Sequence, residues 1–232
     1  MQIKVTLSPQ NEFLMPFNYN YQVQSSIYNV LGDDPSYSKF IHDKGYDYFR
    51  MFTFGGVKGD YTVSNGKMKV TGRISFEVRS PSEEFCDIYE RALLMRDTLC
   101  LFDQELEIRQ VELSDIHIQQ DKLNIVTASP IIARINNEDG STLYCSPEQE
   151  KFTEIICGNI SSKYRAFTGK ESKLEFLYKG DAKKIVTRYK SIWITAYHLK
   201  AELSGSPQLL DFAYQTGLGS RSAQGFGMVN VV

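Results

Sequence analysis

The chain has 232 residues, of which 42% are hydrophobic, 12% aromatic and 23% charged, and its formal net charge is −2 at pH 7. This composition excludes a disordered, collagen-like or coiled-coil protein, and the length predicts one large domain or two of about 100–120 residues. No apolar stretch approaches the ~18–20 residues that span a bilayer, and residues 1–13 lack the layout of a signal peptide. We therefore expect a cytoplasmic protein without a membrane partner.

The charge is unevenly distributed along the chain. Residues 81–121 contain eleven Asp and Glu against three Lys and Arg, a net charge of −8, whereas residues 151–200 contain eleven Lys and Arg against four Asp and Glu, a net charge of +7. An asymmetry of this size predicts a basic face that binds a polyanion. Two solvated faces of opposite charge are the alternative.

The cysteines and histidines do not form a metal-binding pattern. The four cysteines are separated by 14, 45 and 12 residues without a Cys-x-x-Cys pair, and the three histidines, at positions 42, 117 and 198, are far apart. Structural zinc ligands usually occur in closely spaced pairs. The sequence therefore predicts no metal and no cofactor, and the cysteines are expected to be small core residues.

The first half of the chain alternates between strand and helix patterns, since apolar residues two apart predict strands and those three and four apart predict helices. The patterns in chain order are a strand at 2–7, helices at 21–31 and 36–43, strands at 50–54 and 67–79, a helix that begins at 80–84, and a strand at 106–113. We interpret this as the β-α-β-β-α-β order that is typical of a ferredoxin-like unit.

The second half repeats this order without obvious sequence identity. Its patterns are a strand region at 122–135, a long helix from 146 onward, strands near 174–178 and 185–203, a short helix at 209–214 and a last strand at 226–232. The sequence thus predicts an α+β fold of two tandem ferredoxin-like domains with antiparallel sheets, residues 1–117 and 118–232.

A glycine-rich segment, GLGSRSAQGFG at 217–227, joins the last predicted helix to the last predicted strand. Because glycine has no Cβ, such a segment can bring backbone N–H groups close to a phosphate. It is not a Walker loop, because no Gly-Lys-Ser/Thr follows, and it is not a dinucleotide fingerprint, because it leads from helix to strand. A turn without a ligand is the alternative.

The complete pattern, Gly-Leu-Gly, five residues and Gly-Phe-Gly, resembles the motif of the CRISPR-associated repeat-processing endoribonucleases, which are tandem ferredoxin-like RNA-binding proteins. Residues 18–28 resemble the first helix of that family, residues 41–46 its histidine segment and residues 51–54 the strand that follows. The resemblance spans the whole chain. It implies metal-independent RNA cleavage, in which a 2′-hydroxyl attacks the adjacent phosphate and leaves a 2′,3′-cyclic phosphate and a 5′-hydroxyl.

The resemblance also implies catalytic residues. His42 lies in the histidine segment, and an imidazole with a pKa near 6.5 exchanges protons readily at neutral pH. Tyr28 matches the tyrosine of the first helix; a phenol is a poor base at neutral pH, so we expect it to orient the 2′-hydroxyl or the phosphate. The stabilising cation is Arg50, counted back from the strand, or Lys44, counted forward from His42.

The RNA-binding residues are expected in three places. The basic connection 179–190 is predicted to form a hairpin, which contacts the RNA backbone in members of the family; a solvated hairpin is the alternative. The candidates are Lys179, Lys183, Lys184 and Arg188 of this hairpin, Gly217, Gly219, Arg221, Gly225 and Gly227 of the glycine-rich segment, and Asn20 and Gln24 near the start of the first helix.

We therefore predict a metal-independent endoribonuclease that cleaves precursor CRISPR RNA within its repeats. The main alternative is a non-cleaving subunit of a CRISPR ribonucleoprotein that binds the repeat RNA, and His42 favours the enzyme because some relatives without cleavage activity lack this histidine. An unrelated ferredoxin-like binding protein is a third class. The expected partner is CRISPR repeat RNA, and association with a CRISPR effector complex and a homodimer are left open.

Overall fold

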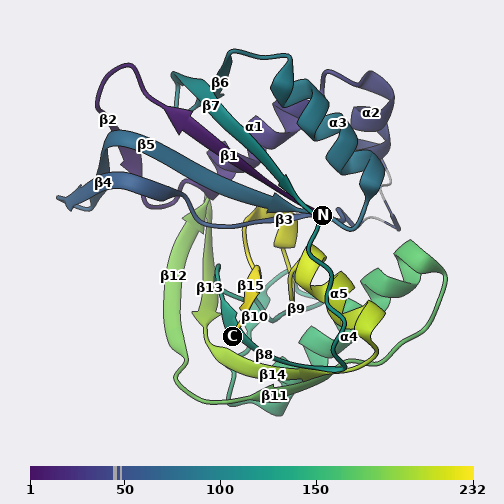
Figure 1. The fold of residues 1–232 in the computed structure, drawn as a ribbon. Coiled ribbons are helices and arrows are strands. Elements are labelled where there is room, and N and C mark those ends of the chain that lie inside the picture. Colours follow the sequence, from purple (N-terminus) through teal and green to yellow (C-terminus); the bar gives the residue numbers. More distant parts are fainter. Residues whose placement is uncertain (44–45, 48) are drawn as a thin grey trace.

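The computed structural model describes residues 1–43, 46–47 and 49–232. Figure 1 shows two units, each made of a sheet with helices, stacked one above the other, with the N-terminus at their junction. The chain passes from the N-terminal unit to the C-terminal unit between Ser114 and Lys122. Among the described residues, no helix is both long and apolar enough to cross a membrane.

The N-terminal unit is one antiparallel sheet with helices packed on one side. Its elements are β1 (Gln2–Ser8), β2 (Phe13–Pro16), α1 (Asn20–Leu31), α2 (Pro35–Asp43), β3 (Thr53–Phe54), β4 (Lys58–Ser64), β5 (Lys67–Arg79), α3 (Glu83–Leu94), β6 (Thr98–Leu101) and β7 (Gln104–Ser114). The antiparallel strands follow the order β2-β5-β1-β7-β6, and β3 and β4 also pair with β5. The three helices lie together on one side of this sheet (Figure 1).

Local sequence explains the central elements of this unit. Ile3, Val5 and Leu7 of β1 are fully buried and alternate with more exposed residues, as a strand with one face on the core requires. The hydroxyl of Ser82 accepts a hydrogen bond from the backbone N–H of Phe85 (3.2 Å) and caps α3. Acidic residues in the first turn of α3 complement the positive end of the helix dipole.

The C-terminal unit has the same four-stranded sheet with two helices, but the elements added to it are different. Its elements are β8 (Lys122–Thr127), β9 (Arg134–Asn136), β10 (Thr142–Tyr144), α4 (Glu150–Thr168), β11 (Glu175–Tyr178), β12 (Lys183–Tyr189), β13 (Ile192–His198), β14 (Lys200–Ser204), α5 (Pro207–Thr216), the short 3-10 helix η1 (Ser222–Gln224) and β15 (Val229–Val231). One antiparallel sheet has the order β11-β14-β8-β15, and the pairs β9-β10 and β12-β13 form separate two-stranded sheets.

The strand order confirms the predicted fold class. The path β4-β5-β1-β7 in the N-terminal unit and the path β11-β14-β8-β15 in the C-terminal unit place corresponding strands in the same positions. Both units are therefore ferredoxin-like. The N-terminal unit adds α2, β2, β3 and β6 to this core, and the C-terminal unit adds the two-stranded sheets.

The predicted strand at 185–203 is wrong, because these residues form three strands instead of one. The chain reverses at residues 190–191, where Lys190 has a positive φ of 54°, so that β12 and β13 form a hairpin outside the main sheet. The basic hairpin is therefore present, but its turn is at Lys190 and lies after the other basic residues. Lys183, Lys184 and Arg188 lie along β12 rather than in a connecting loop.

Arg79 of β5 fixes the junction between the units. Its guanidinium donates hydrogen bonds to the carbonyl oxygen of Val229 (2.6 Å) and to the side-chain oxygen of Asn230 (3.0 Å), and it stacks 4.0 Å from the ring centre of Tyr214. The N-terminal amine donates to the side chain of Gln215 (2.7 Å) nearby. These contacts hold the last strand and α5 against the N-terminal sheet, and they set the position of the glycine-rich segment between them.

Candidate active site

A pocket of about 430 Å³ opens where α1, the segment before β3, α4 and the glycine-rich segment meet, and we call it the junction pocket. Both ferredoxin-like units contribute to it. Its lining residues are Gln24 and Tyr28 of α1, Phe49 and Arg50 before β3, Arg134 of β9, Asn159 and Lys163 of α4, and residues 219–224. The structure thus brings together candidates that lie up to 197 positions apart in the sequence, from Gln24 to Arg221.

The junction pocket is lined by cations. Arg50, Arg134, Lys163 and Arg221 contribute side chains to it, and no carboxylate occurs among its described lining residues. A concave site with one sign of charge concentrates the opposite charge, and the planar guanidinium group binds phosphate oxygens in pairs. The pocket is therefore suited to a phosphate group.

Tyr28 and Arg50 form a pair at the wall of this pocket. The phenol of Tyr28 is hydrogen-bonded to the guanidinium of Arg50, and its ring packs edge-on against Phe52, with 5.9 Å between the ring centres. Burial raises the pKa of Tyr28, which the charge of Arg50 only partly offsets. The phenol is therefore neutral at physiological pH, as expected for an orienting group rather than a base.

The other two predicted catalytic residues are only partly described. His42 belongs to the last turn of α2, but its side chain lies outside the described part of the structure. Lys44 lies outside the described residues altogether. The roles of His42 and Lys44 stay predictions. Of the two alternative cations, Arg50 is the one that the structure describes, and it lies beside Tyr28.

The glycines of the glycine-rich segment are required by the backbone conformation and by packing against the rest of the protein. Gly217, Gly219, Gly225 and Gly227 have φ between 74° and 81°, a region that other residues rarely adopt. A Cβ at Gly219 would lie 2.5 Å from the carbonyl oxygen of Ile132, and one at Gly225 would lie 2.4 Å from the ring of Phe54. The idea that the missing Cβ atoms leave room for a phosphate is wrong at these positions, because protein fills that side.

Asn20 and Gln24 hold the glycine-rich segment in place. The amide nitrogen of Asn20 donates to the carbonyl oxygens of Gln224 (2.9 Å) and Gly225 (3.2 Å), and that of Gln24 donates to the carbonyl oxygen of Ala223 (2.7 Å). The side-chain oxygen of Gln24 accepts a hydrogen bond from Tyr189. These contacts are structural, and binding of RNA by the two side chains stays a prediction.

Arg221 is held in an unusual conformation inside the segment. Its backbone is left-handed, with φ 63°, and its guanidinium donates to the side chain of Gln224 (2.8 Å) while the buried Nε has no hydrogen-bond partner. Burial, followed by the charge of Arg134, lowers the pKa of Arg221 from its usual value. Such a cation is stabilised when an anion binds beside it.

The β12-β13 hairpin crosses from the C-terminal unit to the N-terminal unit. Near its turn, Tyr189 packs edge-on against Tyr21 of α1, and the ammonium of Lys190 lies 4.5 Å from the centre of that ring. The hairpin lies at one side of the molecule, beside the lower surface of the N-terminal sheet (Figure 1). Its exposed cations Lys183, Lys184 and Arg188 therefore follow the edge of the junction.

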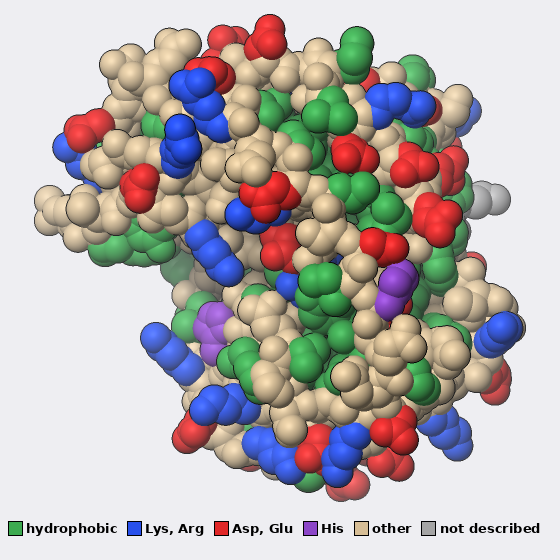
Figure 2. All heavy atoms as spheres, in the orientation of Figure 1, with side chains coloured by type: hydrophobic (Ala, Val, Ile, Leu, Met, Phe, Trp, Pro, Cys, Tyr) green, Lys and Arg blue, Asp and Glu red, His purple; other side chains and the backbone are tan. Residues whose placement is uncertain are grey.

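Lys179 differs from the other basic residues of this region. Its ammonium lies 3.1 Å from Glu202, which also pairs with Lys122 at 2.8 Å. A cation that is already paired gains less from a phosphate than an unpaired one. We therefore expect less RNA binding from Lys179 than from Lys183 and Lys184. Figure 2 shows Asp and Glu side chains gathered over α3 on the N-terminal unit, whereas Lys and Arg side chains are spread over both units and several lie on the lower surface of the C-terminal unit.

Three residues of the junction pocket, Asn159, Lys163 and Arg134, were not predicted from the sequence. Lys163 continues the buried stripe of α4 formed by Phe152, Ile156 and Ile160. A lysine on an otherwise apolar helix face is the sequence feature that could have identified it as a site residue. Arg134 reaches the pocket only because β9 packs beside the glycine-rich segment, which the sequence does not reveal. Across the described residues, no group of three or more His, Cys, Asp or Glu side chains is placed to hold a metal ion.

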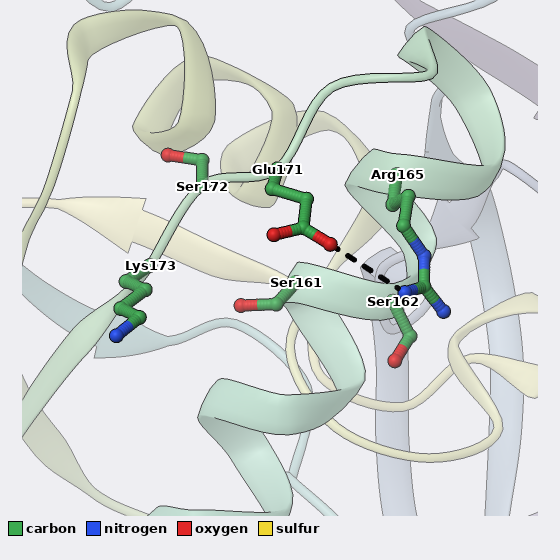
Figure 3. Close-up of a pocket in the computed structure, with 6 residues that line it drawn as sticks. All are labelled: Ser161, Ser162, Arg165, Glu171, Ser172 and Lys173. Carbon is green, nitrogen blue, oxygen red and sulfur yellow. Dashed lines mark ion pairs between the residues drawn. The ribbon is translucent and has the colours of Figure 1, made fainter.

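A second pocket, of about 450 Å³, lies on the C-terminal unit alone, and we call it the α4 pocket. Figure 3 shows its six lining side chains, which come from α4 and the segment that follows it. Arg165 and Glu171 form an ion pair across it, with 3.7 Å between the charged atoms. None of the predicted site residues lies in this pocket.

Comparisons with known proteins agree with this architecture. The family model described as CRISPR-associated protein Cas6, N-terminal, matches residues 14–112, and the one described as CRISPR associated protein Cas6, C-terminal, matches residues 111–231. The chain is 28% identical to CRISPR-associated endoribonuclease Cas6 1 of Methanocaldococcus jannaschii, covering 99% of this chain and 92% of the relative. It is 24% identical to CRISPR-associated endoribonuclease Cas6 of Pyrococcus furiosus, covering 100% and 90%.

Solved structures show the same relationship. A structure described as CRISPR associated protein Cas6 superposes with a TM-score of 0.82 at 28% identity and covers 100% of this chain and 99% of its own. Another, described as an RAMP protein binding different RNA substrates, superposes with a TM-score of 0.86 at 20% identity, covering 100% and 99%, and supports the fold. The two family models together span nearly the whole sequence, and the chain therefore belongs to the Cas6 family of CRISPR-associated proteins.

Proposed function

We propose that this protein is an endoribonuclease that binds CRISPR repeat RNA and cleaves the precursor transcript within each repeat, without a metal ion. The observation that carries the proposal is the junction pocket, where Tyr28 and Arg50 of one unit face the glycine-rich segment of the other. The relatives named as Cas6 endoribonucleases support the same activity.

The chemistry requires positive charge and proton transfer at one phosphate. A ribose 2′-oxygen attacks the neighbouring phosphorus, the bond from phosphorus to the 5′-oxygen breaks, and a 2′,3′-cyclic phosphate and a 5′-hydroxyl result. Negative charge accumulates on the non-bridging oxygens in the transition state, and fixed cations stabilise it. Arg50 and Arg221 line the pocket in which we place this phosphate.

Proton transfer is assigned to His42, and orientation of the reacting groups to Tyr28. His42 removes the proton of the 2′-hydroxyl or delivers one to the departing 5′-oxygen, since both protonation states of an imidazole are accessible near neutral pH. The neutral phenol of Tyr28, fixed by Arg50, donates a hydrogen bond that orients the 2′-hydroxyl or the phosphate. A water molecule completes the proton balance where His42 serves only one of the two steps.

The proposal is tested with repeat RNA from the array that accompanies the gene, labelled at its 5′ end and incubated with the protein in excess EDTA. We expect cleavage at one position, a cyclic phosphate on the upstream fragment, and no cleavage when the nucleotide that precedes the cut carries a 2′-deoxyribose. Cleavage that requires a divalent metal contradicts the mechanism. Binding without cleavage by the unaltered protein supports the non-cleaving RNA-binding subunit instead.

A further inference from the structure

Lys163 is a buried cation at the floor of the junction pocket. It extends from α4, is 4% exposed and lies next to the apolar side chains of the same helix face. Lysine is almost never this buried unless its ammonium is paired. The role of Lys163 therefore requires an explanation beyond packing.

The ammonium of Lys163 holds the glycine-rich segment at three points. Its Nζ donates to the hydroxyl of Ser222 (3.1 Å) and to the carbonyl oxygens of Gly217 (3.3 Å) and Gly219 (3.4 Å). An ammonium has three N–H donors, which matches three acceptors, whereas a neutral amine has two. Loss of the proton therefore releases one of the hydrogen bonds that shape the segment.

The three hydrogen-bond partners given above for Lys163 are neutral, and the charged residues described in the lining of its pocket are basic. Arg50, Arg134 and Arg221 line the same pocket, together with the phenol of Tyr28, which burial keeps neutral. No carboxylate is found among the described residues that line this pocket. Burial without a counter-ion lowers the pKa of Lys163 to about 7. The side chain therefore exists in both protonation states near neutral pH in the free protein.

We propose that Lys163 is a positioning residue whose counter-ion is the RNA itself. When a phosphate enters the junction pocket, its negative charge favours the ammonium form, Lys163 takes up a proton from solvent, and all three of its hydrogen bonds hold the glycine-rich segment against the bound RNA. This inference rests on the proposed RNA binding and adds a coupling between binding and protonation.

The sign of the pH dependence follows from the two states. Below pH 7 Lys163 is already charged in the free protein, so its protonation adds nothing to binding. Above pH 7 the free protein has lost this proton and must regain it in the complex. RNA affinity is then expected to fall by up to about tenfold for each pH unit above 7, until the pKa of the complex is reached.

The test measures proton uptake directly. Repeat RNA with a 2′-deoxyribose at the cleavage site is titrated into the protein at pH 8.5 in two buffers of different ionisation enthalpy, and the difference in binding heat gives the protons taken up per complex. We expect about one proton for the unaltered protein. Lys163→Met, which keeps the length of an unbranched chain but has no charge, is expected to bind more weakly with uptake near zero.

His42→Ala is the matched control, because an imidazole with an ordinary pKa of about 6.5 is neutral at pH 8.5. Uptake that persists in His42→Ala supports the assignment to Lys163, and uptake that disappears there overturns it. RNA binding without proton uptake by the unaltered protein, or unchanged uptake in folded Lys163→Met, also overturns it. Failure of the unaltered protein to bind repeat RNA contradicts the proposed function instead. If circular dichroism shows that Lys163→Met does not fold, the proton uptake of the unaltered protein and of His42→Ala tests the proposal.

Discussion

The junction pocket and the α4 pocket have almost the same volume, about 430 and 450 Å³, and α4 contributes to both. They differ in charge compensation. In the α4 pocket the exposed Arg165 is paired with Glu171 and Lys173 is the one further cation, whereas the described lining of the junction pocket contains four basic residues and no carboxylate. Exposed ion pairs contribute little to stability and leave little net charge for a ligand. The larger excess of positive charge in the lining, rather than pocket size, therefore distinguishes the junction pocket as the candidate phosphate site.

The two pockets also differ in how they are built. The α4 pocket comes from a helix and the segment that follows it in sequence, but the junction pocket needs both units in their observed arrangement. The contacts of Arg79 with the last strand are therefore part of the support of the junction pocket. A site that depends on long-range packing is one that a sequence pattern reveals only in fragments.

The largest effect is expected on the cleavage rate, from the residue to which we assign proton transfer. His42→Ala should lower the single-turnover rate about 10²-fold or more while changing RNA affinity less than roughly tenfold, because a proton-transfer group acts in the transition state. Arg165→Ala in the α4 pocket is the matched control and should leave the rate unchanged. Equal rates for His42→Ala and the unaltered protein would contradict the assignment of proton transfer to His42 and would leave Tyr28 and the cations as the catalytic residues.

A smaller effect is expected on stability, at the end of the glycine-rich segment that follows the junction-pocket residues. Gly225 and Gly140 have the same φ of 81°, so alanine imposes the same backbone strain at both. A Cβ at Gly225 meets Phe54 at 2.4 Å, but one at Gly140 meets nothing within 4 Å. Gly225→Ala should therefore lower the free energy of unfolding by about 1–3 kcal/mol more than Gly140→Ala. Urea denaturation measures both, and equal changes would contradict the packing described here.

The smallest effect is expected outside both pockets, on the basic hairpin. Lys183→Ala combined with Lys184→Ala should weaken binding about equally for all RNA sequences, because cations that bind phosphates read no sequence information. The slope of log affinity against log salt should flatten by up to about 0.7 for each phosphate that the variant no longer neutralises. Lys179→Ala, which removes a cation that is paired with Glu202, should change the slope less. An unchanged slope in the double variant would place the hairpin outside the RNA interface.

The core of the fold could be predicted because its signals are local. The alternation of Ile3, Val5 and Leu7 identifies the central strand, and Ser82 followed by acidic residues identifies the start of α3. The break between β12, β13 and β14 could not, because residues 185–203 are rich in β-branched and aromatic residues and contain no Gly, Pro, Asn or Asp that would mark a turn. The reversal at Lys190 is held by contacts of the hairpin with Tyr21, which lies 169 positions earlier.

Only those residues of the candidate site that lie in or next to a recognisable motif could be predicted from the sequence. Tyr28, Arg50 and Arg221 lie in segments that resemble the family, and the structure brings these three to one pocket. Lys163 belongs to no such segment, and its helix predicts only a buried face. Its role depends on which atoms of the glycine-rich segment fold back onto α4, and that information resides in tertiary packing.

The central claim is that the scissile phosphate binds in the junction pocket. Repeat RNA with a photoreactive thiouridine on either side of the cleavage site can be crosslinked to the protein and the attached peptides mapped by mass spectrometry. We expect crosslinks to residues 24–28 of α1 and to residues 219–224 of the glycine-rich segment, because both segments line the pocket. Crosslinks confined to residues 171–173 of the α4 pocket, or absent from both walls of the junction pocket, would contradict this claim.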